Sequence, residues 1–228
     1  MRLIIIGCEY VGKTTLAGGI TTWLAQTLGG ASMGWHDHFV LPYIENPGPD
    51  SEEDAEQILT LRPALREKLQ RYMIQYHFHP EFYLDNHHLL VNWYYADAVY
   101  APLYYGYGGP GQYADRWRLA RSWDREVMEV APDTVLVLMK ASPDVIRARR
   151  RENPHRHCIL QDADVERVLE RFQEQYNASL LRRRFILDTT ETSVAETLDE
   201  FVRRVEPHLT SADQLRILSH QALGPGQP

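Results

Sequence analysis

Short apolar runs alternate along the chain with longer segments whose apolar residues recur at helical spacing. The clearest run is PDTVLVLM, which is too short and too uniformly apolar for an amphipathic helix. The runs predict strands at residues 3–6, 32–35, 88–91, 134–139 and 184–187. The amphipathic segments predict helices at residues 13–28, 63–76, 96–104, 113–130, 143–152, 163–182 and 194–205. This alternation is typical of a parallel sheet with helices on both faces.

Two polar segments rich in proline and glycine interrupt the alternation. IENPGPDSEED, at residues 44–54, is interpreted as a mobile loop near the substrate, because a domain boundary is less expected in so short a chain. GYGGPGQ, at residues 106–112, is a second flexible loop. We therefore expect one domain over residues 1–208, followed within 209–228 by a C-terminal helix and a disordered tail.

The stretch GCEYVGKTT, at residues 7–15, follows the first predicted strand directly and leads into the first predicted helix. Its pattern G-x-x-x-x-G-K-T is that of a phosphate-binding loop in this strand–helix context. A helix that begins at Lys13 leaves its first backbone N–H groups unpaired, and with the helix dipole they form an anion site. An accidental glycine-rich turn with an exposed lysine would not be expected to have both flanking elements in order.

The phosphate-binding loop assigns roles to its side chains. We expect Lys13 to reach the β- and γ-phosphates and the Thr14 hydroxyl to hold Mg²⁺. The residues expected to cradle the phosphates of ATP are Gly7, Cys8, Glu9, Tyr10, Val11, Gly12, Lys13, Thr14 and Thr15.

Composition and missing motifs exclude several classes of function. The net charge of −7 offers no general basic field for duplex nucleic acid or an anionic membrane. No apolar run is long enough to span a membrane, the start carries no signal peptide, and two cysteines give no disulfide framework, so we expect a cytoplasmic protein. The strings Asp-x-x-Gly and Asn-Lys-x-Asp do not occur, which argues against a Ras-like GTP switch.

An arginine-rich segment, SPDVIRARRRENPHRH, stands out in this acidic chain. Arg147, Arg150 and Arg151 share one helical face by their spacing. Guanidinium groups stabilise the charge that spreads over a transferring phosphoryl group, so we interpret residues 147–160 as a lid over the phosphates. The alternative is a solvated helix end whose charge is balanced by Glu152 and the acidic segment that follows.

With these motifs the chain resembles the nucleoside and nucleotide kinases of the P-loop class, and thymidylate and deoxynucleoside kinases most. GCEYVGKTT matches their phosphate-binding loop, and APDTVLVLMKASPDVIRARRREN resembles the fourth strand and arginine-rich lid of thymidylate kinases. VERVLERFQEQYNASLLRRRFILDTTETSVAETLDEFV resembles their following helix, fifth strand and final helix. The similarity covers most of residues 1–205, although only the phosphate-binding loop and lid are specific.

The resemblance implies a three-layer α/β fold of the P-loop NTPase type, with a five-stranded parallel sheet flanked by helices and an arginine-rich lid. It implies transfer of the γ-phosphoryl group of ATP, with Mg²⁺, to a nucleoside or nucleoside monophosphate. Arg147 and Arg151 would act in catalysis, Arg149 would bind ATP, and Asp188 and Thr189 would border the adenine. The expected partner is a small-molecule acceptor, and a homodimer is compatible with the resemblance.

On the acceptor side, GWHDHFVLP places Asp37 just after the second predicted strand, where related kinases carry a carboxylate that orients or deprotonates the acceptor hydroxyl. The carboxyl ends of strands are also where open α/β sheets bind ligands. Asp37 is therefore our candidate base, with a helix cap or turn residue as the alternative. His38 is a poorer candidate, because a histidine beside a carboxylate is as often structural.

The third predicted strand departs from the thymidylate kinase pattern. Those enzymes continue with Asp-Arg-Tyr, whereas this chain has Asn92, Trp93 and Tyr94, so the arginine that would grip an acceptor monophosphate is missing. Asp97 is the nearest carboxylate for Mg²⁺ or the acceptor sugar, and Arg71 or Arg66 would supply the missing grip. Most of the nearby aromatic rings must be core, but one or two, among Phe39, Trp93 and Tyr94, are candidates for stacking on a base.

Two alternatives to a nucleoside or nucleotide kinase remain open. One is a kinase of another hydroxylated acceptor, such as a sugar or a modified base in DNA, and only this one involves nucleic acid. The RRR sequence at 182–184 is more simply explained as a favourable partner for a helix dipole. The other alternative is a nucleotide-binding regulator without turnover.

Overall fold

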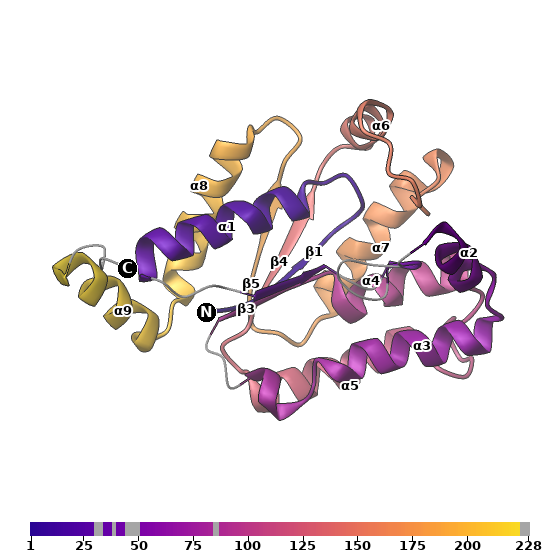
Figure 1. Ribbon diagram of the computed structural model, residues 1–228, viewed down its shortest axis with the longest axis horizontal. Helices are drawn as coiled ribbons and strands as arrows, with labels where there is room; N and C mark the ends of the chain where they lie inside the picture. The colour runs from indigo at the N-terminus through magenta and orange to yellow at the C-terminus, as the bar shows by residue number, and fades with distance from the viewer. Residues whose placement is uncertain (30–33, 38–39, 44–50, 84–86, 224–228) are drawn as a thin grey trace.

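The computed structural model describes residues 1–29, 34–37, 40–43, 51–83 and 87–223 (Figure 1). Of Gly34, Trp35, Asp37, Pro80 and Glu81 only the backbone is described. The predicted disordered tail and most of the predicted loop at residues 44–54 lie outside these ranges.

A parallel sheet of five strands forms the centre of the molecule. Its strands are β1 (Arg2–Ile6), β2 (Gly34–Asp37), β3 (His88–Val91), β4 (Val135–Lys140) and β5 (Arg183–Asp188). They lie in the order β2-β3-β1-β4-β5, and every neighbouring pair is parallel. Ile5 pairs with Val91 on one side and with Val137 on the other, so the strand that leads into the phosphate-binding loop is central. The predicted parallel sheet is confirmed, with β2 starting two residues later than expected.

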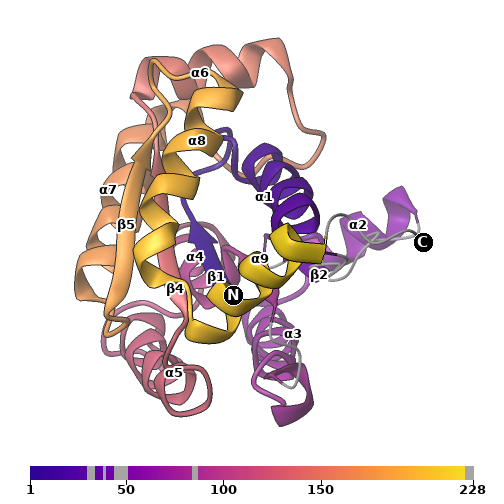
Figure 2. The same ribbon diagram turned by 90° about the vertical axis from the view of Figure 1, so that its left-hand side faces the viewer.

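Helices cover both faces of this sheet, which confirms the predicted α/β architecture (Figures 1 and 2). On one face α1 packs against α8 and α9, and on the other α4 packs against α5 and α7, with α3 beside α4. The bounds of the helices are α1 (Lys13–Leu28), α2 (Glu52–Thr60), α3 (Pro63–Tyr76), α4 (Trp93–Tyr100), α5 (Arg116–Val130), α6 (Pro143–Glu152), α7 (Val165–Ala178), α8 (Val194–Val205) and α9 (Ser211–Leu223).

Four helices differ from the sequence prediction, and one of them, α5, begins at Arg116 instead of residue 113. Helix α2 begins inside the segment predicted as a loop, because Ser51 caps it by accepting from the Asp54 N–H at 3.1 Å. Helix α4 starts three residues early and continues as a π-helix over Ala101–Tyr105, where Pro102 lacks the N–H of a regular turn. Helix α7 ends at Ala178, four residues before its predicted end.

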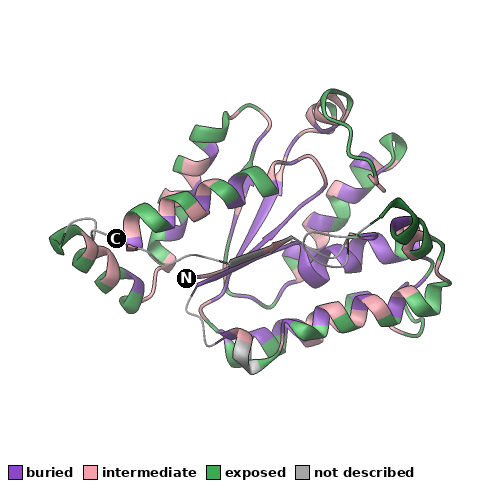
Figure 3. Cartoon of the chain, in the orientation of Figure 1, coloured by how far each residue is buried: buried purple, intermediate pink, exposed green. Residues whose placement is uncertain are grey.

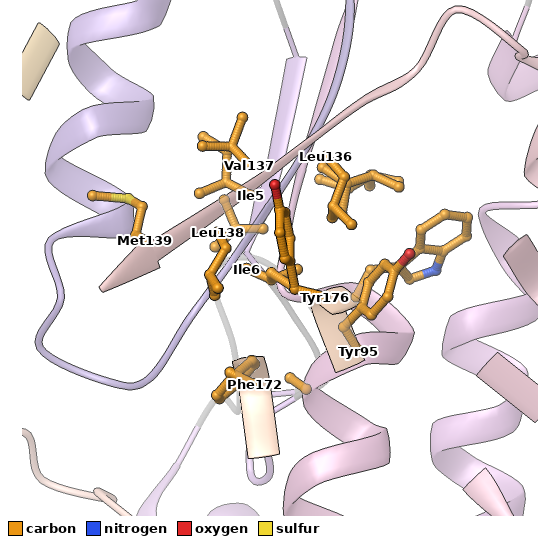
Figure 4. Packing of buried hydrophobic residues seen from close by; sticks show 14 of the residues in the cluster. Ile5, Ile6, Tyr95, Leu136, Val137, Leu138, Met139, Phe172 and Tyr176 are labelled. Carbon is orange, nitrogen blue, oxygen red and sulfur yellow. The ribbon is translucent and has the colours of Figure 1, made fainter. Parts of the chain in front are cut away.

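The core lies between the sheet and its two helical layers. Strands β1, β3 and β4 are almost entirely buried on both faces (Figure 3), and Figure 4 shows Ile5, Leu136 and Val137 beside the rings of Tyr95 and Tyr176. The Tyr94 and Tyr95 hydroxyls both donate to Asp124 Oδ1, at 2.7 and 2.6 Å. These hydrogen bonds satisfy the polar ends of two fully buried rings, as buried tyrosines require.

The N-terminus fixes the last helix to the sheet. The Met1 ammonium group donates to Asp213 Oδ1 at 3.1 Å and contacts His87 Nδ1 at 2.6 Å. This connection joins α9 to the amino ends of β1 and β3, far from the phosphate-binding loop in Figure 1. Within the described ranges, none of the helices has the length and apolar character needed to cross a membrane.

Candidate phosphate-binding site

The phosphate-binding loop connects the central strand β1 to helix α1, and two of its positions require glycine. A Cβ atom on Gly7 would lie 2.5 Å from the Met139 carbonyl oxygen, so the loop can pass close to β4 only without a side chain. Gly12 has φ 94°, in the left-handed region that glycine adopts without strain. Lys13 is only 7% exposed, and its Nζ donates to the Cys8 carbonyl oxygen at 2.7 Å. The loop is thus folded around its own lysine.

A cavity of about 770 Å³ opens over this loop, a size in the range of small-molecule sites. The loop and the start of α1 form its floor, from Glu9 to Leu16. On the side of β4 and β5 it is lined by Met139, Thr189, Thr192, Val194, Thr197 and Leu198. On the side of β2 and β3 it is lined by Val40, Tyr43 and Asn92. The cavity therefore extends from the phosphate-binding loop toward both halves of the sheet.

Arg149 connects the lid segment to the loop and to the end of β5. Its Nη1 donates to the Tyr10 carbonyl oxygen at 3.1 Å, and its Nη2 donates to the Thr189 carbonyl oxygen at 2.7 Å. The Thr189 hydroxyl donates in turn to the Val11 carbonyl oxygen at 3.0 Å. Arg149 and Thr189 therefore lie together at the cavity, and their predicted role in binding ATP stays a prediction. Asp188 is exposed, and its Oδ1 accepts from the Thr190 N–H at 2.9 Å.

The second and third residues of the loop hold the other end of the lid segment. The Leu160 N–H donates to Glu9 Oε2 at 3.1 Å, and the His155 N–H donates to the Tyr10 hydroxyl at 3.0 Å. Burial raises the pKa of the Glu9 carboxyl above its ordinary value, although nearby Lys13 opposes this effect. Burial likewise raises the pKa of the Cys8 thiol to about 12, so the loop cysteine is not a nucleophile at neutral pH.

The other arginines of the lid segment point to different partners. Arg147 donates to Glu166 Oε2 at 2.7 Å, and Arg150 donates to Asp162 Oδ1 at 2.6 Å. Both arginines therefore connect α6 to the start of α7, as a charge-balanced helix end would. Arg151 is exposed and makes no ion pair within the described parts of the chain. A closing lid remains a prediction.

Three solved structures cover almost the whole chain. YorR protein from Bacillus subtilis, in complex with phosphorylated GDP, has 17% identity and a TM-score of 0.56, and the match covers 92% of this chain and 99% of that chain. Deoxyadenosine kinase from M. mycoides, with products dCMP and dCDP, has 14% identity, a TM-score of 0.55, and 91% and 99% coverage. The same enzyme with bound dATP has 14% identity, a TM-score of 0.56, and 90% and 99% coverage.

The chain shares the fold of these structures, two of which are of a deoxyadenosine kinase. At these identities the likeness concerns the fold, whereas the site rests on the residues of this chain. No protein-family model and no curated protein matches the sequence.

In this kinase fold the candidates on the β2 side lie at the limit of the described residues. Asp37 is the last residue of β2, and its backbone pairs with Val91 of β3. Its side chain is not described, and His38 and Phe39 lie outside the described residues. The role of Asp37 therefore stays a prediction.

Four other candidates are not brought to the cavity. Asp97 is 0% exposed, accepts from Arg116 Nε at 2.5 Å and from the Tyr107 hydroxyl at 2.7 Å, and so belongs to a buried ion network. Arg71 extends this network by donating to Glu67 Oε1 at 2.6 Å. Trp93 and Tyr94 are completely buried, because α4 is covered on every side. None of the four lines the cavity.

Several described residues of the cavity wall were not singled out from the sequence. Asn92 lies in the wall, and it was noted in the sequence only as a departure from the kinase pattern. Tyr43 precedes the segment interpreted as a loop, and His155 and His157 lie in the segment interpreted as a lid, where no periodic pattern indicates which side chains face inward. Val194, Thr197 and Leu198 are on the first turns of α8, whose helical spacing was evident although its contact with the cavity was not.

Proposed function

We propose that the protein is an ATP-dependent phosphotransferase that moves the γ-phosphoryl group to a nucleoside or nucleoside monophosphate. One observation carries the proposal: Lys13 and Arg149 both line one cavity, and this cavity continues from the phosphate-binding loop to the ends of β2 and β3. Such a cavity has room for a donor and an acceptor whose reacting atoms meet over the loop. The kinase fold and the nucleotides in the neighbouring structures support the same reading.

In this proposal the donor lies toward β4 and β5. Its phosphates lie at the N-terminus of α1, whose first turn carries no acidic side chain to oppose them. Lys13 and Arg149 place two positive charges where the γ-phosphoryl oxygens gain charge during transfer. The base of the donor nucleotide lies against the part of the cavity wall formed by Val194, Thr197 and Leu198.

A bound Mg²⁺ fits the oxygen donors that this site offers. Thr14 is exposed in the first turn of α1 and lines the cavity, so its hydroxyl is the candidate protein ligand. No cluster of three or more His, Cys, Asp or Glu side chains suitable for a metal occurs in the described part of the chain. Magnesium at such sites needs none, because phosphates and waters supply most of its ligands. The ion would neutralise charge on the β- and γ-phosphates.

The acceptor lies toward β2 and β3, with Asp37 proposed to orient or deprotonate its hydroxyl. Glu9 is a second carboxylate at this cavity, and its raised pKa brings it closer to neutral pH. The lid segment, joined to the loop through Tyr10 and Glu9, would exclude water from the reacting groups.

The alternatives make different demands on the surface and on turnover. A DNA acceptor needs a basic track, yet Arg183 and Arg184 donate to carbonyl oxygens of His208 and Tyr176 and so serve the fold. A regulator needs ATP binding without turnover. The deciding experiment measures ATP consumption against nucleosides, their monophosphates, sugars and short oligonucleotides. Transfer to a nucleoside or monophosphate is expected; tight ATP binding without transfer to any acceptor would establish the regulator instead.

A further inference from the structure

Asn92 has a buried polar atom that finds no hydrogen-bond partner among the described residues. It follows β3, is 2% exposed and lines the cavity. Its backbone is satisfied, because its N–H donates to the Ile5 carbonyl oxygen at 2.7 Å and its carbonyl accepts from the Ala96 N–H at 3.3 Å. Its side-chain Oδ1, in contrast, has no hydrogen-bond partner. Such an atom is rare in a folded protein and requires an explanation.

The backbone at the same residue is strained. Asn92 has φ 67° and ψ −59°, and Trp93 has φ 45°, which places two successive residues with side chains outside the common regions. The surroundings impose this conformation, since Ile5 holds the Asn92 N–H and the Trp93 Nε1 donates to the Ile74 carbonyl oxygen at 3.2 Å. Strain that the fold maintains at a cavity is typical of a functional position.

Positive charge is confined to the other part of the cavity. Among the described wall residues the lysine and arginine side chains are Lys13 and Arg149, and both are bound at the phosphate-binding loop. On the β2–β3 side the described wall includes Val40, Tyr43, Asn92 and His157, whose ring centroid lies 6.0 Å from that of Tyr43. The segments that the structure leaves undescribed contain no lysine or arginine in the sequence. This side of the cavity therefore offers no lysine or arginine to a second phosphate group.

We propose that Asn92 binds the acceptor hydroxyl through its Oδ1 and that the acceptor is an unphosphorylated nucleoside. The inference rests on the proposed kinase function and narrows its substrate. A hydroxyl group donates the hydrogen bond that Oδ1 lacks, whereas a monophosphate at neutral pH carries nearly two negative charges and mainly accepts hydrogen bonds. The wall beside Asn92 contains no lysine or arginine. It therefore suits the hydroxyl group of a nucleoside and gives the phosphate of a monophosphate no such counter-charge.

The transfer step forms one bond and breaks one bond at the γ-phosphorus. The nucleoside hydroxyl oxygen forms a bond to the γ-phosphorus while the bond from that phosphorus to the bridging oxygen of ADP breaks, and the electron pair leaves with ADP. The hydroxyl proton passes to the proposed base, Asp37, as the new bond forms, because an amide oxygen is too weak a base to retain it. Asn92 is thus a positioning group that fixes the direction of the hydroxyl.

The test compares Asn92→Ala, Asn92→Asp and Asn92→Gly with the wild type, using a set of deoxynucleosides and the matching monophosphates as acceptors. Asn177→Ala, on the exposed surface of α7, is the matched control. We expect the wild type to favour nucleosides, and Asn92→Ala to lower kcat/KM for them about tenfold with an unchanged KM for ATP. Asn92→Asp should retain most of this activity, since a carboxylate accepts the same hydrogen bond.

Thermal unfolding supplies a second measurement that does not require turnover. Asn92→Gly should unfold about 3 °C higher than Asn92→Ala, because glycine relieves the strained backbone, and yet be no more active. Nucleosides should raise the Tm of the wild type and not that of Asn92→Ala. A preference for monophosphates, or unchanged nucleoside binding and kcat/KM in Asn92→Ala, would overturn the inference. Absence of transfer to both classes would remove the kinase proposal, and the nucleoside Tm shifts would still decide the role of Asn92.

Discussion

Tyr10 and His155 stack with their ring centroids 4.4 Å apart, although one belongs to the phosphate-binding loop and the other to the arginine-rich segment. Their rings are inclined by only 25°, and the His155 N–H donates to the Tyr10 hydroxyl at 3.0 Å. With the Leu160–Glu9 hydrogen bond and Arg149, this contact joins the loop to both ends of the proposed lid. The loop proposed to bind phosphates is therefore connected to the segment proposed to cover them.

We predict that residues 147–157 exchange backbone hydrogens slowly only when donor and acceptor are bound, because closure over them excludes water. An ATP analogue with a nucleoside should slow exchange throughout this segment. Tyr10→Phe should make exchange of the His155 amide faster by about fivefold to tenfold, since its acceptor is lost while the ring remains. Tyr72→Phe, exposed on α3, is the control. Unchanged exchange at saturating ligand would favour the solvated helix end.

Lys13→Ala should abolish transfer while the fold persists. The ammonium group stabilises charge that develops during transfer, and loss of one such group is expected to lower kcat by about 10²–10³-fold or more. The hydrogen bond from its ammonium group to the Cys8 carbonyl contributes about 2 kcal/mol to stability, which is a fraction of the stability of a folded domain. Turnover and urea unfolding are measured together, with Lys68→Ala on the exposed surface of α3 as the control. Near-normal turnover in Lys13→Ala would exclude the loop from the mechanism.

The fold and the phosphate-binding loop were predictable because local sequence determines both. Four apolar residues before Gly7 must form a buried strand, and Gly7 itself is required by the 2.5 Å approach to Met139. The acceptor side was less predictable, because an aromatic or acidic residue on a buried helix has the same sequence signature in a core and in a pocket. Asp97 illustrates this: Arg116, 19 positions away along the chain, draws it into an ion network. Such a partner has no regular spacing to reveal it.

The conformation of Asn92 could not be predicted from the sequence either, although the departure of its residue type from the kinase pattern could be seen there. Nothing in the sequence indicates positive φ at an asparagine followed by tryptophan, since the strain arises from β1 and α3 around it. The sequence did reveal that a charged pair of the related kinases is replaced there by a neutral amide and a buried ring. The structure adds that this amide lines the cavity, and we therefore propose that it contacts the acceptor.

Stability should fall in acid because His88 is buried without its charge. His88 is 4% exposed on β3 between the rings of Phe82 and Tyr83, and its Nδ1 has no hydrogen-bond partner. Burial first, and then the nearby Arg2 and N-terminal ammonium, lower its pKa to about 3, although Asp133 opposes this effect. Between pH 6.5 and that value the unfolded chain binds a proton that the folded protein does not, so stability is lost as the pH falls.

For His88 alone the expected loss between pH 7 and pH 5 is about 2 kcal/mol in the free energy of unfolding. Urea unfolding at several pH values measures this loss. In His88→Gln the free energy of unfolding should change less steeply with pH. Part of the slope should remain in that variant, because the pKa of His87 is also lowered, to about 4, chiefly by burial. His79→Gln, at an exposed position, should leave the slope unchanged. An equal slope in His88→Gln and the wild type would refute the assignment.

The last prediction concerns Asp37, whose backbone ends β2 beside Val91 at the carboxyl edge of the sheet. If its carboxylate accepts the acceptor proton or orients the hydroxyl, Asp37→Asn should lower kcat while ATP binding persists. An amide keeps the shape but loses both basicity and negative charge. General-base assistance contributes about 10²–10⁴-fold, and the loose transition state of phosphoryl transfer places much of that in orientation.

A cap or turn residue at position 37 would behave differently, because asparagine caps helices about as well as aspartate. Asp199→Asn, exposed on α8, is the control for an unspecific loss of negative charge. Wild-type kcat in Asp37→Asn would return Asp37 to a structural role, and Asp97 could not replace it from its buried ion pair with Arg116. The described carboxylates that line the cavity are then Glu9 and Glu152, and of these Glu9 belongs to the loop itself and has a pKa that burial raises. Glu9→Gln should in that case show the loss of kcat, with the Leu160 hydrogen bond retained by the amide oxygen.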